Sequence, residues 1–244
     1  MVTFGTQPMR FTPSSMSVSL DRIADFLSTV PLFRELDRQA LRGFAEVTRE
    51  QRVAKGALVV TEGDAGDALY VVRSGEVKVA LPGDEGREVI LGILGVGDHF
   101  GELSLVDGRP RSAHVVATQP STLIVLRRAE FRRQVEQNPQ VAWGLMVELS
   151  RRLRQADGTI GSLVLLDVPG RVARVLLEHA GPGEPATLIK QLTHQTMAHM
   201  IGASRETVSR AMAEFQEKGF ISVQRRVVTI TDRAALESRS RPRI

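Results

Sequence analysis

The sequence contains no cysteine among its 244 residues. This absence excludes disulfide bonds, iron–sulfur clusters, cysteine-ligated zinc and thiol catalysis. The sequence also lacks an apolar run close to the roughly 18 residues that a membrane span requires. Its first residues, MVTFGTQPMRFTPSSMSVS, lack the continuous apolar stretch behind a basic start that is typical of a secretory signal. We therefore expect a soluble, cytoplasmic protein with a flexible N-terminal arm over residues 1–20.

The length and the charge distribution suggest two parts with different partners. A chain of 244 residues exceeds the usual size of a single domain. The formal net charge is only +4, but residues 170–244 contain 12 Lys and Arg against 7 Asp and Glu, whereas residues 1–169 contain 20 against 21. The excess of positive charge at the C-terminal end favours a polyanion such as nucleic acid as its partner, although basic residues often form only a solvated surface.

The pattern of apolar residues changes along the chain. Apolar residues recur at helical spacing over residues 19–47, where Pro31 predicts a break between two short helices. Eleven of the 21 glycines then fall within residues 56–108, where they separate short apolar runs. This pattern predicts about eight short strands between residues 53 and 126. We expect the strands to close into a small barrel or roll, because one open sheet would leave its edges and an apolar face exposed.

A long helix is expected next, with Asn138 as N-cap and Pro139 as the first residue. It extends for about 28 residues and carries an apolar stripe close to coiled-coil spacing. The stripe consists of Val141, Leu145, Leu149, Leu153, Ile160 and Leu163. We interpret the stripe as a dimer seam; packing of the helix on its own domain is the alternative. Pro169 and Gly170 then predict a hinge.

The C-terminal part predicts a helix-turn-helix. LTHQTMAHMIGASRETVSRAMAEFQEKGF reads as two helices joined by a tight turn at Gly202, with Thr193 and Ser204 as N-caps. One side of the second helix is apolar on a helical wheel. The other side carries Arg205, Glu206, Ser209 and Arg210. Arginine can bond to guanine O6 and N7, and glutamate can accept from cytosine N4, so this face suits a major groove.

Two further features bear on this interpretation. The alternative is a solvated helix face with an i,i+4 pair between Glu206 and Arg210. The following segment, FISVQRRVVTI, predicts a hairpin with Arg225 and Arg226 at its tip. Such a wing is suited to phosphate contacts.

The segment GASRETVSR resembles the recognition helix of the bacterial CRP/FNR regulators, in their cyclic-AMP receptor protein branch. The residues of that family that read bases match Arg205, Glu206 and Arg210. The resemblance also includes LLDVPGRVARVLL and the glycine-rich strand region, and so covers residues from about 25 to 231. It implies a winged helix-turn-helix and a half-site like TGTGA, read twice by a symmetric dimer.

The segment FGELSLVDGRPRSA, residues 100–113, resembles the phosphate-binding cassette of the same family. The chemistry agrees, because the fork of Arg111 suits a single phosphate charge and Glu102 can accept from a ribose 2′-hydroxyl. Main-chain N–H groups at the start of a short helix, from Gly101 to Leu103, and the hydroxyl of Ser112 would add donors. Arg111 and Glu102 would also offset the cost of burying one another.

Two other interpretations of this segment remain. One is a purely structural Glu–Arg pair that closes the barrel. The other is a cupin-like metalloenzyme that would use His99, Glu102 and His114, although the His-x-His pair of such sites is missing. We expect no metal site and no enzymatic activity.

One departure from the family concerns the effector. Where the cyclic-AMP branch carries a Thr and a Ser that face the adenine, this sequence has Ala156 and Asp157. A carboxylate can still accept from the adenine N6 amine and would repel guanine O6, so cyclic AMP is the expected effector. A cyclic dinucleotide, or no ligand, is the alternative.

The expected fold class is α+β. A cyclic-nucleotide-binding β-roll, jelly-roll-like, is expected over residues 21–137, a dimerisation helix over 138–168 and a winged helix-turn-helix over 169–244. The candidate nucleotide-binding residues are Gly101, Glu102, Leu103, Arg111, Ser112, Ala113, Arg152 and Asp157. The candidate DNA-binding residues are Thr193, Ser204, Arg205, Glu206, Ser209, Arg210, Arg225 and Arg226. The expected partners are promoter DNA, a second copy of the chain and RNA polymerase, with no membrane; docking of the C-terminal domain on a protein instead of DNA is the alternative.

Overall fold

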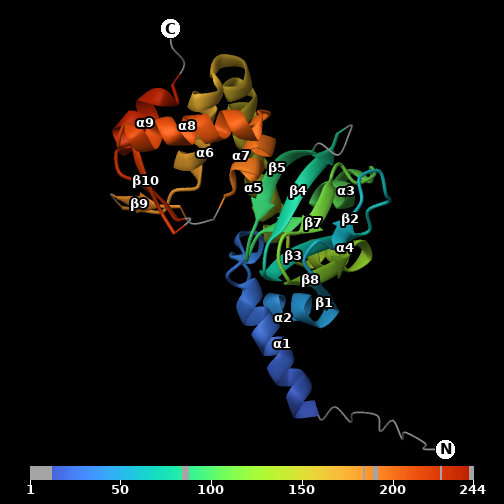
Figure 1. Ribbon diagram of the computed structural model, residues 1–244. Helices are drawn as coiled ribbons and strands as arrows, with labels where there is room; N and C mark the ends of the chain where they lie inside the picture. The colour runs from blue at the N-terminus through green and yellow to red at the C-terminus, as the bar shows by residue number, and fades with distance from the viewer. Residues whose placement is uncertain (1–12, 84–87, 184, 189–191, 226, 242–244) are drawn as a thin grey trace, which may run out of the picture. The chain divides into compact units, whose positions relative to one another are not determined.

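The structure is a computed structural model that describes residues 13–83, 88–183, 185–188, 192–225 and 227–241 (Figure 1). Helices and sheets are both present, as the predicted fold class requires. The first part of the expected arm, residues 1–12, lies outside the described residues. Helix α1 spans Pro13–Leu27, so residues 13–20 of the expected arm are helical.

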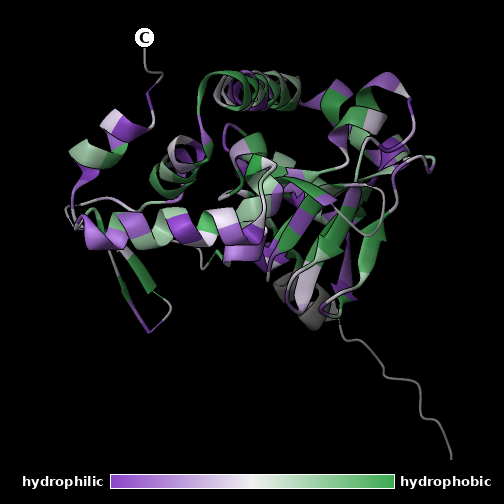
Figure 2. Cartoon of the chain, turned by 45° about the horizontal axis from the view of Figure 1, so that its top comes forward, coloured by the Kyte–Doolittle hydropathy of each residue, from purple (hydrophilic) through white to green (hydrophobic). Residues whose placement is uncertain are grey.

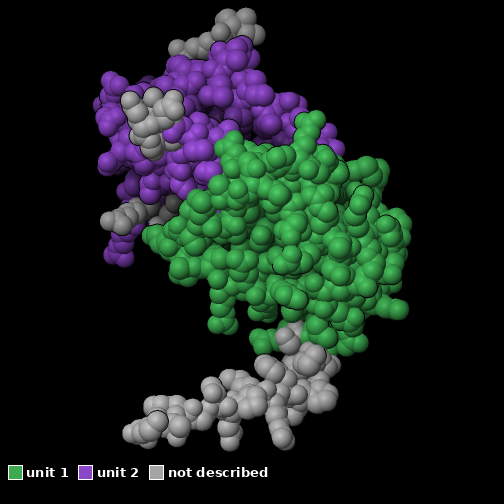
Figure 3. Space-filling model, turned by 90° about the vertical axis from the view of Figure 1, so that its right-hand side faces the viewer, with its two compact units in different colours: residues 1–77, 94–112, 116–149 green, residues 78–93, 113–115, 150–244 purple. Residues whose placement is uncertain are grey.

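The chain divides into two compact units, coloured separately in Figure 3. The first comprises residues 1–77, 94–112 and 116–149, and the second comprises residues 78–93, 113–115 and 150–244. Hydrophobic and hydrophilic residues lie side by side along both helices and strands (Figure 2). Such mixing is typical of elements that bury one face and expose the other. Among the described residues, none of the helices combines the length and apolar character needed to cross a membrane.

The helical structure is interrupted at Pro31, between the first two α-helices, as predicted. A short 3-10 helix, η1 (Pro31–Phe33), follows α1, and α2 spans Arg38–Val47. The carboxylate of Asp37 caps α2 by accepting from the main-chain N of Ala40 at 2.8 Å. Buried Phe33 and Phe44, with ring centroids 4.9 Å apart, bring these helices into the core of the first unit.

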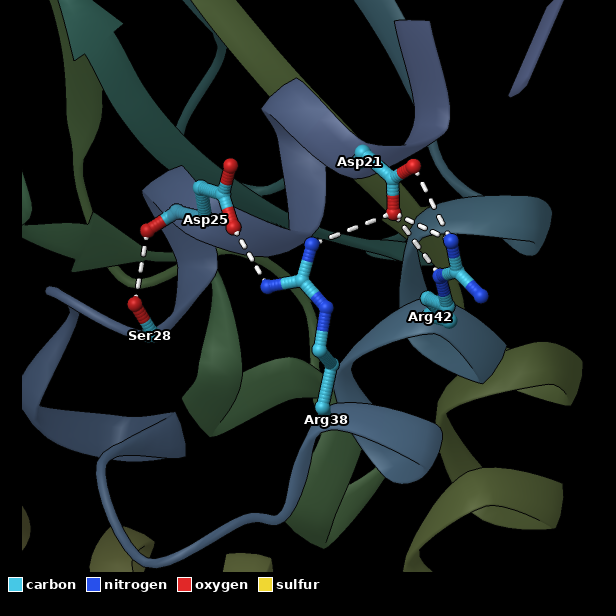
Figure 4. A network of polar contacts seen from close by, with 5 residues as sticks. All are labelled: Asp21, Asp25, Ser28, Arg38 and Arg42. Atoms are coloured by element: carbon cyan, nitrogen blue, oxygen red, sulfur yellow. Dashed lines mark hydrogen bonds and ion pairs between the residues drawn. The ribbon is translucent and has the colours of Figure 1, made fainter. Parts of the chain in front are cut away.

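Ion pairs join the outer surfaces of α1 and α2 (Figure 4). Arg38 donates to Asp25 at 2.8 Å and to Asp21 at 3.3 Å, and Arg42 donates to Asp21 at 2.8 Å. The hydrogen bond and the charge of Asp25, with a contribution from Asp21, raise the pKa of Arg38. The side chains of Arg38, Arg42 and Asp25 are more than half exposed to solvent, so these ion pairs contribute little to the stability of the fold.

The glycine-rich region forms strands with one short helix, as predicted. Its elements are β1 (Arg49–Val53), β2 (Leu58–Val60), β3 (Ala68–Ser74), β4 (Val77–Pro82), β5 (Glu88–Leu94), β6 (His99–Phe100), α3 (Glu102–Asp107), β7 (His114–Ala117) and β8 (Ser121–Arg127). The strands form two four-stranded sheets, in the orders β1-β8-β3-β6 and β2-β7-β4-β5. Antiparallel pairing of β3 with β8 and β6 places the start of α3 beside β3.

The long helix begins one residue later than predicted. Helix α4 spans Arg128–Gln137 and α5 spans Gln140–Leu165. Asn138 ends α4 instead of starting α5, because both its main-chain N and its side-chain amide donate to the carbonyl of Gln134, at 2.9 and 3.0 Å. The N-cap prediction is therefore wrong.

The predicted stripe on α5 is wrong in its first half. Val141 and Leu145 are buried in the core of the first unit, and Leu149 packs against the same core. One row of exposed residues on α5 instead has a regular spacing of three and four: Trp143, Met146, Ser150, Leu153, Asp157, Ile160 and Val164. This spacing is that of a coiled-coil seam, and it retains only Leu153 and Ile160 of the predicted stripe. Asp157 occupies a position of the seam.

The C-terminal fold begins at Asp167. The elements are α6 (Val168–Glu178), β9 (Ala186–Thr187), α7 (His194–Ile201), α8 (Arg205–Glu217), β10 (Ile221–Gln224), β11 (Val227–Ile230) and α9 (Arg233–Arg239). The Asp167 carboxylate caps α6 by accepting from Gly170 N at 2.9 Å. Pro169 therefore belongs to the first turn of α6, where its missing N–H costs no hydrogen bond, and the break in the chain precedes it. Strands β10, β11 and β9 form one sheet in that order.

Candidate functional site

The segment that resembles a phosphate-binding cassette folds as a tight turn followed by α3. Gly101 has a φ of 85°, which only glycine adopts without strain. A Cβ atom there would lie 2.8 Å from the carbonyl oxygen of Ala68 and would overlap the Arg111 side chain. Glycine thus allows α3 to begin directly against the end of β3.

Arg111 is placed at the N-terminal end of α3. Its residue is only 7% exposed, and its guanidinium donates to the carbonyls of Gly101 at 2.9 Å and Ala68 at 2.8 Å. The guanidinium carbon lies 5.7 Å from the ring centroid of Tyr70. Because a guanidinium has five N–H donors, these two bonds leave donors for an anion.

The remaining cassette residues differ in exposure. Glu102, the first residue of α3, is 3% exposed, whereas Leu103 is largely exposed. Ser112 is exposed beside Arg111, and Ala113 is buried. The structure therefore brings the predicted residues from Gly101 to Ser112 together at one end of a short helix, where main-chain N–H groups and an arginine converge.

Among the described residues, no three His, Asp or Glu side chains lie together as a metal ion would require.

Two other candidate residues lie on α5. Arg152 is half-buried and Asp157 is exposed, and both belong to the second compact unit. Ala156, beside Asp157, is also exposed.

The helix-turn-helix has the predicted caps. The hydroxyl of Thr193 accepts from Thr196 N at 3.0 Å, and that of Ser204 accepts from Thr207 N at 3.2 Å. Gly202 joins the helices with a φ of 62°. Buried side chains of α8, Val208, Ala211, Met212 and Phe215, hold it in the core of the second unit.

The opposite face of α8 is polar, as the wheel predicts. Arg205, Glu206 and Arg210 are exposed, and Ser209 is half-buried. A hydrogen bond from its own main-chain N–H, and then one from the Ser204 hydroxyl, lower the pKa of Glu206. Arg210 donates to the Thr207 hydroxyl at 3.3 Å.

Sequence reasoning missed His194. Its Nδ1 lies 2.8 Å from the hydroxyl oxygen of Ser209, so α7 and α8 are joined by a hydrogen bond on the polar face. It also missed Arg128, whose guanidinium bonds to main-chain carbonyls beside α3. Neither contact has a local signal in the sequence, because the partners are at least 15 residues apart.

The wing is present as a hairpin of β10 and β11. Arg225 lies in its turn with a φ of 49°, an uncommon conformation for a residue other than glycine. Arg226, the other predicted residue of the tip, lies outside the described residues.

Two families match the sequence. The Cyclic nucleotide-binding domain matches residues 50–138, and the Crp-like helix-turn-helix domain matches residues 170–239. A CRP-like cAMP-activated global transcriptional regulator of Mycobacterium tuberculosis is 33% identical over 222 residues, which are 89% of this chain and 99% of that protein.

Solved structures share the fold. The catabolite activator protein of Thermus thermophilus is 33% identical, with a TM-score of 0.52 over 86% of this chain and 98% of the other. CLP of Xanthomonas campestris, described as a c-di-GMP responsive global regulator, has a TM-score of 0.68 over 80% of this chain and 99% of the other. At 23% identity, this second likeness concerns the fold alone.

Proposed function

The chain belongs to the CRP/FNR family of transcriptional regulators, and we propose from this that it is a homodimer that binds promoter DNA under the control of cyclic AMP. The observation that carries the proposal is the presence of two sites in one chain. Arg111 and the start of α3 suit a single phosphate, and the polar face of α8 suits base edges. A chain that couples the binding of a cyclic nucleotide to the binding of DNA acts as a transcriptional regulator and not as an enzyme. RNA polymerase is then its expected partner.

Cyclic AMP is favoured by the chemistry of two residues. Arg111 supplies a charged fork for the cyclic phosphate. Asp157 offers a carboxylate that can accept from the adenine N6 amine and would repel guanine O6. The relative from Mycobacterium tuberculosis, named as cAMP-activated, supports the same effector.

A second candidate effector is a cyclic dinucleotide, and constitutive activity is a third possibility. Ala156 and Asp157 stand where the cyclic-AMP branch has two hydroxyls, so the hydrogen bonds that those hydroxyls make to adenine are lost. The shared fold with the c-di-GMP responsive regulator CLP supports testing this ligand.

Calorimetry tests the effector. We expect the purified protein to bind cyclic AMP more tightly than cyclic GMP or cyclic di-GMP. Arg111→Leu should weaken the binding of cyclic AMP by about 100-fold, since it removes a charged fork, and should leave the dimer folded. Arg109→Leu is the matched control, because Arg109 is close in sequence and its side chain is 85% exposed. If cyclic AMP binds equally to the Arg111→Leu variant, the cassette is not the site.

Salt dependence tests the DNA proposal. Binding to a palindromic site with two TGTGA-like half-sites should fall steeply as salt concentration rises, because phosphate contacts release counterions. A C-terminal domain that docks on protein would show no binding to such a site at any salt concentration.

A further inference from the structure

Two arginines tie the same two segments of the first unit together. Arg111 joins the start of α3 to the start of β3, through the carbonyls of Gly101 and Ala68. Arg128, the first residue of α4, joins α3 to the turn before β3. Its Nη2 donates to the carbonyls of Ser104 at 2.7 Å and Gly66 at 2.5 Å.

The position of Arg128 suits the end of a helix. The carbonyl of Ser104 accepts from the main-chain N of Gly108, the C-cap of α3, at 3.1 Å, and the last carbonyls of α3 form the negative end of its dipole. Nη2 bonds to the carbonyl of Ser104, and Nη1 lies 3.5 Å from that of Leu105. The main-chain N of Arg128 also donates to the carbonyl of Asp67 at 2.7 Å. Both the side chain and the main chain of Arg128 are therefore fixed against the turn before β3.

The contact between α3 and this turn is tight. A Cβ atom at Gly66 would lie 2.5 Å from the Cβ of Ser104 and 2.7 Å from Nε of Arg111. Position 66 therefore excludes a side chain, and a small displacement of α3 would also displace the side chain of Arg111.

We propose that Arg128 is a positioning residue of the nucleotide site, a role that rests on the proposed function. A cyclic phosphate would accept from those donors of Arg111 that its bonds to the carbonyls of Gly101 and Ala68 leave available. Arg128 does not touch these carbonyls. It holds α3 against the turn before β3, so the N–H groups of the first turn keep the geometry that a phosphate requires.

The test compares Arg128→Gln with Arg127→Gln in the full-length chain. Arg127 is the matched control, because it is adjacent, its side chain is 68% exposed, and it pairs with Asp67 at 3.0 Å. We expect Arg128→Gln to weaken the binding of cyclic AMP about tenfold or more by calorimetry, because charged hydrogen bonds that hold the site are lost. Arg127→Gln should change the affinity less than twofold. Equal affinities of the two variants would overturn the proposal.

Hydrogen exchange in the ligand-free protein provides a second readout. Arg128→Gln should speed exchange of the α3 amides, residues 102–107, without changing exchange in α8, and Arg127→Gln should leave both unchanged. If the wild type binds no cyclic nucleotide, the proposed effector is wrong, whereas unchanged exchange in α3 shows that Arg128 does not hold the helix.

Arg128→Lys covers the case in which the Gln variant does not fold. Lysine keeps the charge and can donate to one or two of the carbonyls, but it lacks the fork. We expect a folded protein with an intermediate affinity for cyclic AMP. Wild-type affinity and wild-type exchange in α3 for this variant would mean that the fork of Arg128 has no role in the site.

Discussion

At the scale of single residues, the hydrogen bonding of Ser209, a predicted DNA-binding residue, depends on a neighbouring side chain. Its hydroxyl bonds to Nδ1 of His194 on the preceding helix. If His194 accepts from the hydroxyl, Ser209 can only accept a hydrogen bond from a base. If His194 donates to the hydroxyl, Ser209 can donate a hydrogen bond to a base. His194 therefore sets the hydrogen-bonding character of Ser209 on the polar face of α8.

We expect His194→Ala and Ser209→Ala to weaken binding to the specific site, and the double variant to lose no more than the worse single variant. The coupling free energy should be about 1 kcal/mol, as for one hydrogen bond between neutral groups. A double-mutant cycle by fluorescence anisotropy measures it. Gln195→Ala is the control, because Gln195 is adjacent but bonds to His199. Additive losses would show that the pair does not act as a unit.

Glu206 and Arg225 should affect DNA binding in different ways. The Glu206 side chain is exposed, and its carboxylate, ionised at neutral pH, can accept from a cytosine amine. Glu206→Ala should therefore reduce the preference at one base pair of each half-site roughly tenfold, whereas Arg225→Ala should weaken all sequences alike. Binding to a set of single-base variants of the site measures both effects. A uniform loss for Glu206→Ala would contradict base reading.

The same residues show what the sequence could predict. The caps Thr193 and Ser204 are confirmed, because capping depends on residues three positions apart. Arg128 and His194 could not be found, because their partners are distant in sequence and are brought near only by tertiary packing.

At the scale of elements, α5 shows where periodicity alone is ambiguous. The helix has apolar residues on two sides, and the sequence does not say which side meets the core. The row of Val141, Leu145 and Leu149 packs within the first unit, which leaves the row that contains Trp143 and Leu153 exposed. Both the existence of the helix and the strand-rich region before it were predicted, because long periodic segments and glycine-separated runs are strong local signals.

Two of the three glycines inside α5, Gly158 and Gly161, should respond differently to alanine. Each costs about 1 kcal/mol in helix propensity relative to alanine. A Cβ at Gly161 would meet nothing within 4 Å, so Gly161→Ala should raise the free energy of unfolding by about that amount. A Cβ at Gly158 would overlap the guanidinium of Arg174 in α6, which donates to the Gly158 carbonyl and pairs with Glu178.

Gly158→Ala should therefore gain less stability than Gly161→Ala, or lose some, because Arg174 must move. Urea unfolding of the two full-length variants at one protein concentration measures the difference. Equal gains would mean that Arg174 rearranges without cost, and that its bond to α5 contributes nothing to stability.

At the scale of the whole molecule, the proposed dimer would place the exposed seam on α5 against a second copy of the chain. In a symmetric dimer each seam residue approaches its own counterpart or a close neighbour on the other copy. The apolar positions, Trp143, Leu153, Ile160 and Val164, favour association. Asp157 opposes it, because two carboxylates in a partly desolvated seam repel each other. The ligand-free dimer is thus weakened near its middle, and a ligand amine at Asp157 would relieve that repulsion and give the liganded dimer its advantage.

Asp157→Asn should therefore tighten the ligand-free dimer by roughly three- to tenfold in Kd, since it keeps the size of the side chain and removes the charge. Leu153→Asp, one seam position earlier, should do the opposite by adding a charge to an apolar position, and Ser150→Ala should change the Kd little. Sedimentation equilibrium at neutral pH without nucleotide measures all three. The Asn variant should also gain less from cyclic AMP in DNA binding, because the repulsion that the ligand relieves is already absent. If the ligand-free dimer of Asp157→Asn is no tighter than that of the wild type, Asp157 lies outside the seam. Its carboxylate then does not control dimerisation.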